Sequence, residues 1–442
     1  MKKLKILMIG WEYPPEITGG LGIATHGIAK ALGELGNKVI FLIPRITRKE
    51  PKDKNVIIIG VNSKYLPIPQ EELKRFLLET MHLQTMNLYQ SNVFISPEKF
   101  WEEFEEKQSL LQEEFSIETK EIHLEGGYGK NLYFEIQAFA EFVAKIASKL
   151  PTIDLIHAHD WMTFPSALYA KHVTGKPIIL HVHATEFDRS GDHPNSYVFN
   201  LEKYAFEKAD AIITVSNYTR QIIIDKYQID PNKIYPVYNA IDFQYSEAKD
   251  VKKPIRQRIV LFLGRITFQK GPDYFVRAAK KVVEKIQNVK FLMVGTGDMY
   301  SRMIEMAADL GIGKYFHYTG FLERNKIEQI FKMSDVYVLP SVSEPFGLTV
   351  LEALKSGIPV IVSKQSGVSE IVQNAIKVDF WDVDDIANHI IKLLEDEEYK
   401  NQLKQKLVEE EIHKISWYDS AQKIEEIYHI VLNQIQFLKG SL

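Results

Sequence analysis

Two glutamates eight positions apart form the segment of this sequence best suited to chemistry. Glu344 follows a short apolar run that predicts a buried strand, and Glu352 lies in a helix predicted to begin near Gly347. A carboxylate oxygen accepts several hydrogen bonds, which suits the hydroxyls of a sugar or a ribose. Amides at the N-terminus of that helix are suited to phosphate oxygens. These amides belong to Phe346, Gly347, Leu348 and Thr349. Two solvated surface glutamates are the plain alternative, and the apolar setting and the Pro-Phe-Gly turn oppose it.

Two cations follow another predicted strand. Arg265 comes directly after Gly264, and Lys270 follows five positions later beside Gly271. Fixed cations at the carboxyl end of a strand neutralise the charge that develops on a departing diphosphate. Isolated surface cations are common, so it is their position after the strand that favours a functional role.

A pair of glycines precedes the first predicted helix. Gly19 and Gly20 end a loop that begins after the strand at Leu4–Gly10. Glycines at this place let backbone N–H groups and the positive end of the helix approach a phosphate. A flexible turn is the alternative reading. The motif Gly-x-Gly-x-x-Gly does not occur in this loop, which disfavours a dehydrogenase.

Histidine pairs end two neighbouring strands of the predicted first sheet. They are His157 with His159, and His181 with His183. In open α/β sheets ligands bind beyond the carboxyl ends of the strands, so these side chains are expected to face a cleft. Buried histidines bonded to the backbone are an alternative. A metal site of the His-x-His kind is another, but it is disfavoured because the fold expected around such a site is a single barrel, whereas the strand order here splits at the linker.

The elements that position these residues alternate short apolar runs with amphipathic helices. This alternation is typical of parallel sheets that are covered on both faces. The strands predicted in the first half are Leu4–Gly10, Lys38–Pro44, Val56–Val61, Leu155–His159, Pro177–His183, Ala211–Ser216 and Ile234–Tyr238. The strands predicted in the second half are Ile259–Gly264, Val289–Gly295, Phe316–Gly320, Val336–Ser341 and Pro359–Ser363.

A charged stretch between Gln244 and Arg258 interrupts the alternation and is typical of an exposed linker. We therefore predict an α/β protein of two Rossmann-like, doubly wound domains that face each other across a cleft. The predicted boundaries are 1–243 for the N-terminal domain, 244–416 for the C-terminal domain and 417–442 for a terminal helix. The apolar face of that helix needs a partner, and the first domain is the candidate.

Residues 62–131 break the rhythm of the first domain with a charged and aromatic segment that includes Phe100, Trp101 and Phe104. Aromatic faces stack on sugar rings at low entropy cost, so we assign the insertion to acceptor recognition. A small core of its own, or a contact between subunits of an oligomer, is the alternative.

Composition narrows the class of protein. The chain has 442 residues, a formal net charge of -4, 25% charged residues and no cysteine. The length suits two domains, and the charge gives no reason to expect a nucleic-acid partner. The absence of cysteine excludes disulfides and fits a cytoplasmic location. No apolar stretch approaches the roughly 20 residues that span a bilayer, so no transmembrane segment is predicted.

In combination these motifs resemble the retaining glycosyltransferases of the GT-B fold. The resemblance is to the family that includes sucrose-phosphate synthases and cell-envelope mannosyltransferases, and to its glycogen-synthase relatives. It covers nearly the whole chain, because the Glu344 to Glu352 segment, the Gly264 to Gly271 segment and the Gly-Gly loop occur together in the family's order. The resemblance implies transfer of a hexosyl group, most simply glucosyl, from UDP- or ADP-glucose to a sugar or glucan acceptor. It implies no cofactor and no metal ion.

The resemblance also implies roles for single residues. Arg265 and Lys270 are expected to bind the donor diphosphate, Glu344 the hydroxyls of the transferred sugar and Glu352 the ribose. His159 is expected beside the reacting sugar. The residues expected to border the rest of the donor are Gly19, Gly20, Gly295, Phe321 and Leu322. The residues assigned to the acceptor side are Asp160, His183 and Glu186.

One position departs from the pattern. Bacterial glycogen synthases have the motif Lys-x-Gly-Gly in the first loop, and here Ile17 occupies the position of the lysine. This shifts the interpretation toward the broader family, so a sucrose-phosphate-synthase-like or cell-envelope glycosyltransferase stays open. A nucleotide-sugar epimerase of the same fold would act without an acceptor, and a binding protein would bind without turnover.

Overall fold

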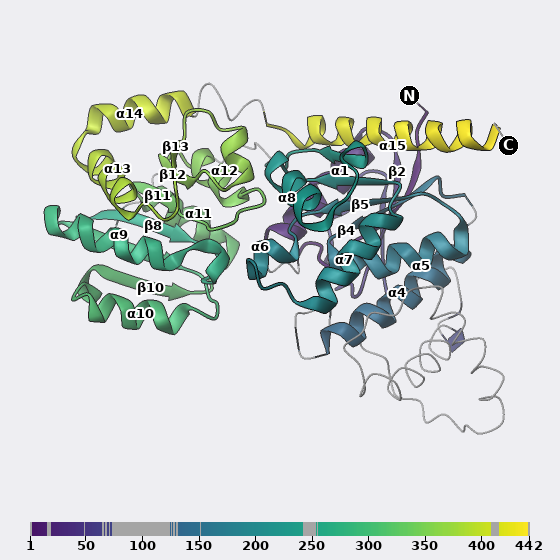
Figure 1. The fold of residues 1–442 in the computed structure, drawn as a ribbon, viewed down its shortest axis with the longest axis horizontal. Helices are drawn as coiled ribbons and strands as arrows, with labels where there is room; N and C mark the ends of the chain where they lie inside the picture. Colours follow the sequence, from purple (N-terminus) through teal and green to yellow (C-terminus); the bar gives the residue numbers. More distant parts are fainter. Residues whose placement is uncertain are drawn as a thin grey trace, which may run out of the picture.

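The computed structural model describes residues 2–15, 19–47, 49–63, 131–150, 152–241, 255–407 and 415–440, with the single positions 66, 69, 71, 72, 124, 126, 129 and 253. Within these ranges the chain forms two parallel sheets that lie side by side, each with helices around it (Figure 1). We call the part up to residue 241 the N-terminal half and residues 253–407 the C-terminal half. The predicted insertion 62–131 lies almost entirely outside the described residues. Ile17 and most of the predicted linker also lie outside them.

The N-terminal sheet has seven parallel strands in the order β3-β2-β1-β4-β5-β6-β7. Its strands are nearly continuous apolar runs because both faces are covered. They are β1 Lys5–Ile9, β2 Lys38–Ile43, β3 Val56–Gly60, β4 Leu155–His159, β5 Ile178–Val182, β6 Ala211–Thr214 and β7 Ile234–Pro236. The helices of this half are α1 Gly20–Glu34, α4 Leu132–Ser148, α5 Phe164–Thr174, α6 Glu186–Ser190, α7 Ser196–Lys208 and α8 Asn217–Tyr227. Two short 3₁₀ turns are η1 Trp161–Thr163 and η2 Pro231–Lys233.

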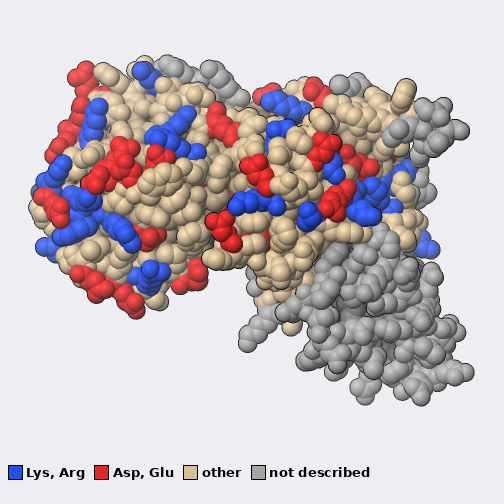
Figure 2. Space-filling view, in the orientation of Figure 1, with Lys and Arg blue, Asp and Glu red and all other residues tan. Residues whose placement is uncertain are grey.

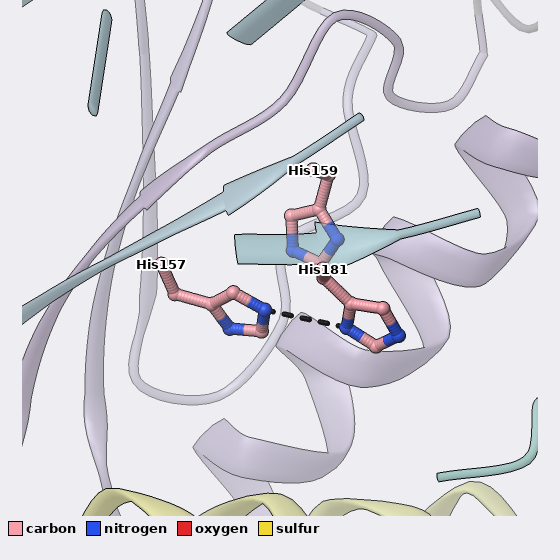
Figure 3. Close-up of side chains that lie close together, drawn as sticks. All are labelled: His157, His159 and His181. Atoms are coloured by element: carbon pink, nitrogen blue, oxygen red, sulfur yellow. Dashed lines mark hydrogen bonds between the residues drawn. The ribbon is translucent and has the colours of Figure 1, made fainter. Parts of the chain in front are cut away.

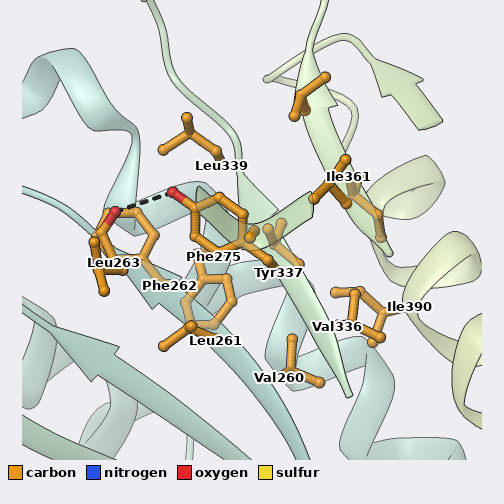
Figure 4. Packing of buried hydrophobic residues seen from close by; sticks show 14 of the residues in the cluster. Val260, Leu261, Phe262, Leu263, Phe275, Val336, Tyr337, Leu339, Ile361 and Ile390 are labelled. Atoms are coloured by element: carbon orange, nitrogen blue, oxygen red, sulfur yellow. Dashed lines mark hydrogen bonds between the residues drawn. The ribbon is translucent and has the colours of Figure 1, made fainter. Parts of the chain in front are cut away.

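The C-terminal sheet has six parallel strands in the order β10-β9-β8-β11-β12-β13. They are β8 Arg258–Leu263, β9 Val289–Val294, β10 Phe316–Gly320, β11 Val336–Leu339, β12 Val360–Ser363 and β13 Ile376–Val378. The helices are α9 Pro272–Lys285, α10 Tyr300–Asp309, α11 Arg324–Met333, α12 Leu348–Lys355, α13 Val383–Glu395 and α14 Glu397–Lys406. The 3₁₀ turns are η3 Phe268–Lys270, η4 Gly313–Tyr315 and η5 Gly367–Glu370. In the core Phe275 of α9 and Ile390 of α13 pack against the central strands β8 and β11 (Figure 4).

The last helix, α15 Trp417–Gly440, returns to the N-terminal half and lies along it beside α1 (Figure 1). Its buried residues Ile424 and Tyr428 belong to the same apolar cluster as Ile6 of β1. A Cβ atom added to Gly27 of α1 would lie 2.3 Å from the Trp417 ring, so this close packing requires glycine. The prediction that the terminal helix packs on the first domain is therefore confirmed.

Every strand that the apolar runs predict is present, within one or two residues at its ends. The sequence missed β13, because Ile376–Val378 has three residues and includes a lysine, too short a run to recognise. Lys and Arg are interspersed with Asp and Glu over the face shown in Figure 2. Among the described helices, none is both long and apolar enough to cross a bilayer.

Candidate active site

The loops that follow the strands of the two sheets meet each other. Gly20, after β1, approaches Leu348, after β11: a Cβ atom added to Gly20 would lie 3.4 Å from Leu348 Cδ1. Ser343 donates a hydrogen bond of 2.5 Å to Asp188 of α6 in the other half. The carboxyl ends of the strands are where open α/β sheets bind ligands, and two of the predicted site residues, Gly20 and Leu348, meet at the junction of the two halves.

Two helix N-termini face this junction. Helix α1 begins at Gly20 after Gly19, and α12 begins at Leu348 after Gly347. Within the described residues, neither helix has a side-chain cap or an acidic residue in its first turn. The first N–H groups of a helix lack partners and carry a partial positive charge. Two such ends beside each other make a site suited to an anion with several oxygens.

The predicted cations lie next to the predicted glutamate. Lys270, in η3, forms an ion pair with Glu344 Oε2, and the Ser341 hydroxyl lies 3.4 Å from the same oxygen. Glu344 is 5% exposed, and its backbone is fixed by a hydrogen bond from its N–H to Gln365 O at 2.9 Å. Arg265 is exposed, and its guanidinium has no ion-pair partner in the described part of the chain. One cation is thus already bound by a carboxylate, and the other is open to a ligand.

Tyr337 of β11 links the first turn of α12 to the end of β8. Its hydroxyl lies 3.1 Å from Leu263 O and 2.8 Å from Thr349 Oγ1. Burial, with the nearby carboxylates of Glu344 and Glu352, raises the pKa of Tyr337. The tyrosine is therefore neutral between the two glutamates, and Glu352 is half-buried on the second turn of α12.

The ends of β8, β9 and β10 converge at the predicted nucleoside site. Gly295 has φ +131°, and a Cβ atom there would lie 1.9 Å from Gly264 O, so only glycine fits. Its N–H donates to Gly320 O at 3.0 Å. The next residues, Phe321 and Leu322, differ in exposure: the Phe321 ring is 66% exposed, and Leu322 packs partly against the core. An exposed aromatic ring at a strand end is free to stack on a base.

The four histidines lie on one face of the N-terminal sheet. Residues two apart on a strand share a face, and β4 pairs with β5 so that His159 lies opposite His181. His157 Nε2 lies 3.3 Å from His181 Nδ1 (Figure 3), and His159 Nδ1 lies 3.0 Å from His183 Nε2. On its other side His157 Nδ1 lies 2.5 Å from the Tyr428 hydroxyl of α15. The cluster thus runs from the junction to the terminal helix.

Burial keeps these imidazoles neutral. It lowers the pKa of His157 and of His183 to about 3, and it lowers the pKa of His159 and of His181 well below 6.5. In all but His183, neighbouring histidines lower the pKa further. At neutral pH the cluster therefore carries no positive charge, and each ring has one donor and one acceptor nitrogen.

Neutral imidazoles are also metal ligands, and one nitrogen from each of His157, His159 and His181 lies within 4.8 Å of the others. The Nε2 atoms of His159 and His181 are buried and have no partner among the described residues. The group contains no carboxylate to offset the charge of an ion, and each ring already has a hydrogen-bond partner: His157 bonds to His181 and Tyr428, and His159 bonds to His183. A hydrogen-bonded neutral cluster accounts for the arrangement as well as a metal site does, and chelation distinguishes the two.

Asp160 has a strained backbone at the end of β4. Its φ is +63°, a conformation that side chains other than glycine rarely adopt. Its Oδ1 accepts hydrogen bonds from the N–H groups of His183 at 2.7 Å and Ala184 at 3.2 Å. Burial raises the pKa of Asp160, and the charges of Arg189 and of Arg265 in the other half oppose this. The Asp160 carboxylate thus fixes the backbone of His183 beside the junction.

Glu186, the third residue assigned to the acceptor, makes internal contacts. Its Oε2 accepts from Arg189 Nε at 3.1 Å, and its Oε1 accepts from Ser190 Oγ at 2.6 Å and from the N–H of Asn195 at 3.1 Å. Glu186 is 5% exposed. The carboxylate therefore stabilises the loop between α6 and α7, and its contact with an acceptor stays a prediction.

Sequence reasoning missed the residues that join the two halves. Asp188 and Tyr218 contact Ser343, Ser216 contacts Pro345, and Glu370 contacts the start of α8. The partners in these contacts lie 125 to 155 positions apart in the chain. No local spacing could have indicated them.

Two Rossmann-like sheets whose strand ends meet at helix N-termini, cations and a buried glutamate are the architecture of a GT-B glycosyltransferase. Residues 5–231 match the family described as starch synthase catalytic domain, and residues 245–409 match glycosyl transferases group 1. The chain therefore belongs to the starch synthase and group 1 glycosyltransferases of the GT-B fold.

Similar proteins span nearly the whole chain. An uncharacterized glycosyltransferase of Methanocaldococcus jannaschii is 27% identical over 98% of this chain and 100% of its own length. The catalytic domain of starch synthase IV from Arabidopsis thaliana, bound to ADP and acarbose, superposes with a TM-score of 0.68 and 16% identity over 98% of this chain and 100% of that chain. The Anabaena protein HepE, in complex with UDP and glucose, does so with a TM-score of 0.66 and 15% identity over 96% of this chain and 98% of that chain. The two solved structures support the fold.

A pocket of about 460 Å³ lies apart from these residues. It is formed between the end of β7, the segment after η5 and the start of α15, with Tyr238, Asn374 and Ser420 among its walls. None of the predicted site residues lines it.

Proposed function

We propose that the protein is a retaining hexosyltransferase that moves a glucosyl group from UDP- or ADP-glucose to a sugar or glucan acceptor without a metal ion. The observation that carries the proposal is the approach of Gly20 to Leu348, which brings together two helix N-termini that have no side-chain cap among the described residues. Arg265 and Lys270 follow β8, at the same edge of the C-terminal sheet as the start of α12. A nucleoside diphosphate is an anion of the right chemistry for these groups.

The donor is divided between groups with different tasks. Arg265 and Lys270 bind the diphosphate and stabilise its charge as it departs. Glu344 binds the sugar hydroxyls and Glu352 the ribose, because each carboxylate accepts hydrogen bonds from neighbouring hydroxyls. Phe321 is exposed where the base would lie. Binding of the donor transfers Lys270 from its present ion pair with Glu344 toward the diphosphate and frees the Glu344 carboxylate for the sugar.

The transfer proceeds on one face of the sugar. The bond between the anomeric carbon and the diphosphate oxygen breaks, and the bond to the acceptor oxygen forms on the same face. The acceptor proton passes to the departing phosphate oxygen. His159 is neutral, and its buried Nε2 has no partner in the described residues, so it is the ring nitrogen left to bond the reacting sugar. Glu344 acts by positioning and not as a nucleophile, because its carboxylate binds the hydroxyls of the transferred sugar.

The comparisons support the choice of donors to test. One similar structure contains UDP and glucose, and another contains ADP and acarbose. The match of residues 5–231 to the starch synthase family supports a glucan acceptor. A sucrose-phosphate-synthase-like acceptor is the second candidate, since the chain also matches the group 1 family.

The test is a panel of nucleotide sugars with and without glucan, sugar-phosphate and lipid acceptors. We expect nucleoside diphosphate release that depends on both a donor and an acceptor, and a product with the α-anomeric configuration of the donor. Arg265→Ala should abolish most of this release, whereas Arg302→Ala, on the exposed side of α10, should not. Release without an acceptor would favour the epimerase, an inverted anomer would overturn retention, and binding without turnover would leave a binding protein.

A further inference from the structure

A carboxylate of the C-terminal half binds the exposed end of a helix in the N-terminal half. Glu370 ends η5, and its Oε2 accepts the N–H of Asn217 at 3.0 Å while its Oε1 accepts the N–H of Tyr218 at 2.7 Å. The Asn217 side-chain amide donates to Oε2 at 3.1 Å, and the Tyr238 hydroxyl donates to it at 2.9 Å. Four donors of the N-terminal half thus converge on one carboxylate.

These contacts complete the cap of α8. The helix has a cap of its own, because the Ser216 hydroxyl accepts the N–H of Thr219 at 3.0 Å. That bond leaves the N–H groups of Asn217 and Tyr218, which a helix cannot satisfy internally. Glu370, 153 positions away from Asn217, satisfies both and brings a negative charge to the positive end of the helix. The complete cap therefore forms only when the two halves are in this arrangement.

The turn that carries Glu370 is bonded to the loop that carries Glu344. The N–H of Glu344 donates to Gln365 O, and the N–H of Gly367 donates to Glu344 O, both at 2.9 Å. A short parallel bridge joins Glu344 and Ser366. These bonds join the backbone at Glu344 to residues 365–367, which lead directly into the turn that carries Glu370. A shift of the Glu370 turn therefore moves Glu344 with it.

The start of α8 also holds the residue next to Glu344. The Ser216 hydroxyl donates to Pro345 O at 2.6 Å. A Cβ atom added to Gly367 would lie 2.2 Å from Pro345 O and 2.5 Å from Ser216 Cβ, so the backbones meet without room for a side chain. The Tyr218 hydroxyl contacts Ser343 Oγ at 3.0 Å, so the start of α8 touches the residues on both sides of Glu344.

We propose that Glu370 is a positioning residue. It caps α8 across the junction and thereby holds Glu344 at a fixed position relative to the histidines of the N-terminal half. The catalytic consequence rests on the proposed function, and the cap itself does not. Arg265, Lys270 and the start of α12 are in the C-terminal half, and of the proposed phosphate-binding groups only the start of α1 lies across the junction, so loss of the cap leaves most of donor binding intact. It lowers the rate of transfer, because the sugar is then misplaced relative to the acceptor side.

The central variant is Glu370→Gln. It keeps the size of the side chain, but donors face both carboxylate oxygens, so either orientation of the new amide group points an N–H toward another donor. Glu370→Asp keeps the charge and both acceptors. The matched control is Asp384→Asn, which removes a surface carboxylate whose ion pair with Lys281, at 2.6 Å, lies on the outer helices α9 and α13.

Three measurements test the effect. Hydrogen exchange of the Asn217 and Tyr218 amides in the ligand-free protein should quicken about 10-fold or more in Glu370→Gln, and stay unchanged in Asp384→Asn. The kcat with UDP-glucose or ADP-glucose should fall by about 10- to 100-fold. The affinity for UDP or ADP should stay within about 2-fold, and Glu370→Asp should recover part of the kcat. Gly367→Ala, which crowds the same junction without a change of charge, should quicken the same amides.

Unchanged exchange at Asn217 and Tyr218 in Glu370→Gln would overturn the cap. Faster exchange with an unchanged kcat, or a loss confined to KM, would overturn the positioning role. Exchange and nucleotide affinity are measured without turnover. A wild-type protein that transfers no sugar would therefore count against the proposed function, while the exchange measurement still decides the cap.

Discussion

Replacement of His157 by asparagine should make the N-terminal half less sensitive to acid. Burial lowers the pKa of His157 to about 3, whereas an unfolded chain gives histidine a pKa of about 6.5. Between pH 6.5 and about pH 3 the unfolded state therefore binds a proton at His157 that the folded state does not bind. The stability that this histidine contributes is complete above pH 6.5 and is lost as the pH falls from there toward 3.

The magnitude follows from the two pKa values. Each pKa unit corresponds to about 1.4 kcal/mol, so between pH 7 and pH 5 the folded state loses about 2 kcal/mol through His157. For a unit of roughly 200 residues this is about 4–8 °C in Tm. Wild-type protein alone does not isolate the effect. Burial raises the pKa of Glu202 to about 7, and that carboxyl gains stability over the same range.

The assay is thermal unfolding of His157→Asn and wild type at pH 7 and pH 5. Asparagine does not titrate, and its amide is placed to keep a contact with the Tyr428 hydroxyl. The variant should lose stability at pH 7 and recover about 4–8 °C relative to wild type at pH 5. His317→Asn, at an exposed position of β10, is the control and should differ from wild type equally at both pH values. A constant difference between His157→Asn and wild type would refute the reasoning.

Other expectations follow from the junction. Arg265→Ala should lower kcat by about 10²-fold with an unchanged Tm, because its side chain is exposed and unpaired within the described residues. Lys270→Ala should lower kcat similarly and also reduce the free energy of unfolding by about 3–5 kcal/mol, because it leaves the buried Glu344 without its cation. Near-normal turnover in either variant would contradict the role assigned to that cation. Transfer should survive chelation, since cationic side chains are proposed to bind the diphosphate in place of a metal ion, and a loss that one divalent ion restores would return the histidine cluster to a metal site. Small-angle scattering should show a more compact particle with bound nucleotide, because the proposed phosphate-binding groups are divided between the two halves, and an unchanged radius of gyration at saturating nucleotide would contradict domain closure.

Sequence was sufficient wherever the determinant was local. The strands could be predicted because a strand covered on both faces must be a run of apolar residues, and β4, β8 and β11 are such runs. Their ends indicate where a site would lie, because in a parallel sheet the residue after each strand lies at the ligand-binding edge. For this reason the sequence predicts Arg265 and Glu344 as site residues, and their roles stay predictions. The three-residue β13 was missed because it offers too few positions for a pattern.

Tertiary structure alone decided which groups are bonded and how they titrate. The sequence shows Lys270 and Glu344 as separate candidates, whereas the fold makes them an ion pair 74 positions apart. The sequence also predicts that Glu186 contacts the acceptor, whereas in the fold both of its carboxylate oxygens accept hydrogen bonds from Arg189 and Ser190. The neutral state of His157 depends on burial beneath Tyr428, which lies 271 positions further along the chain. Hydrogen bonding and desolvation depend on distance in space, and folding sets that distance through contacts that no spacing along the chain records.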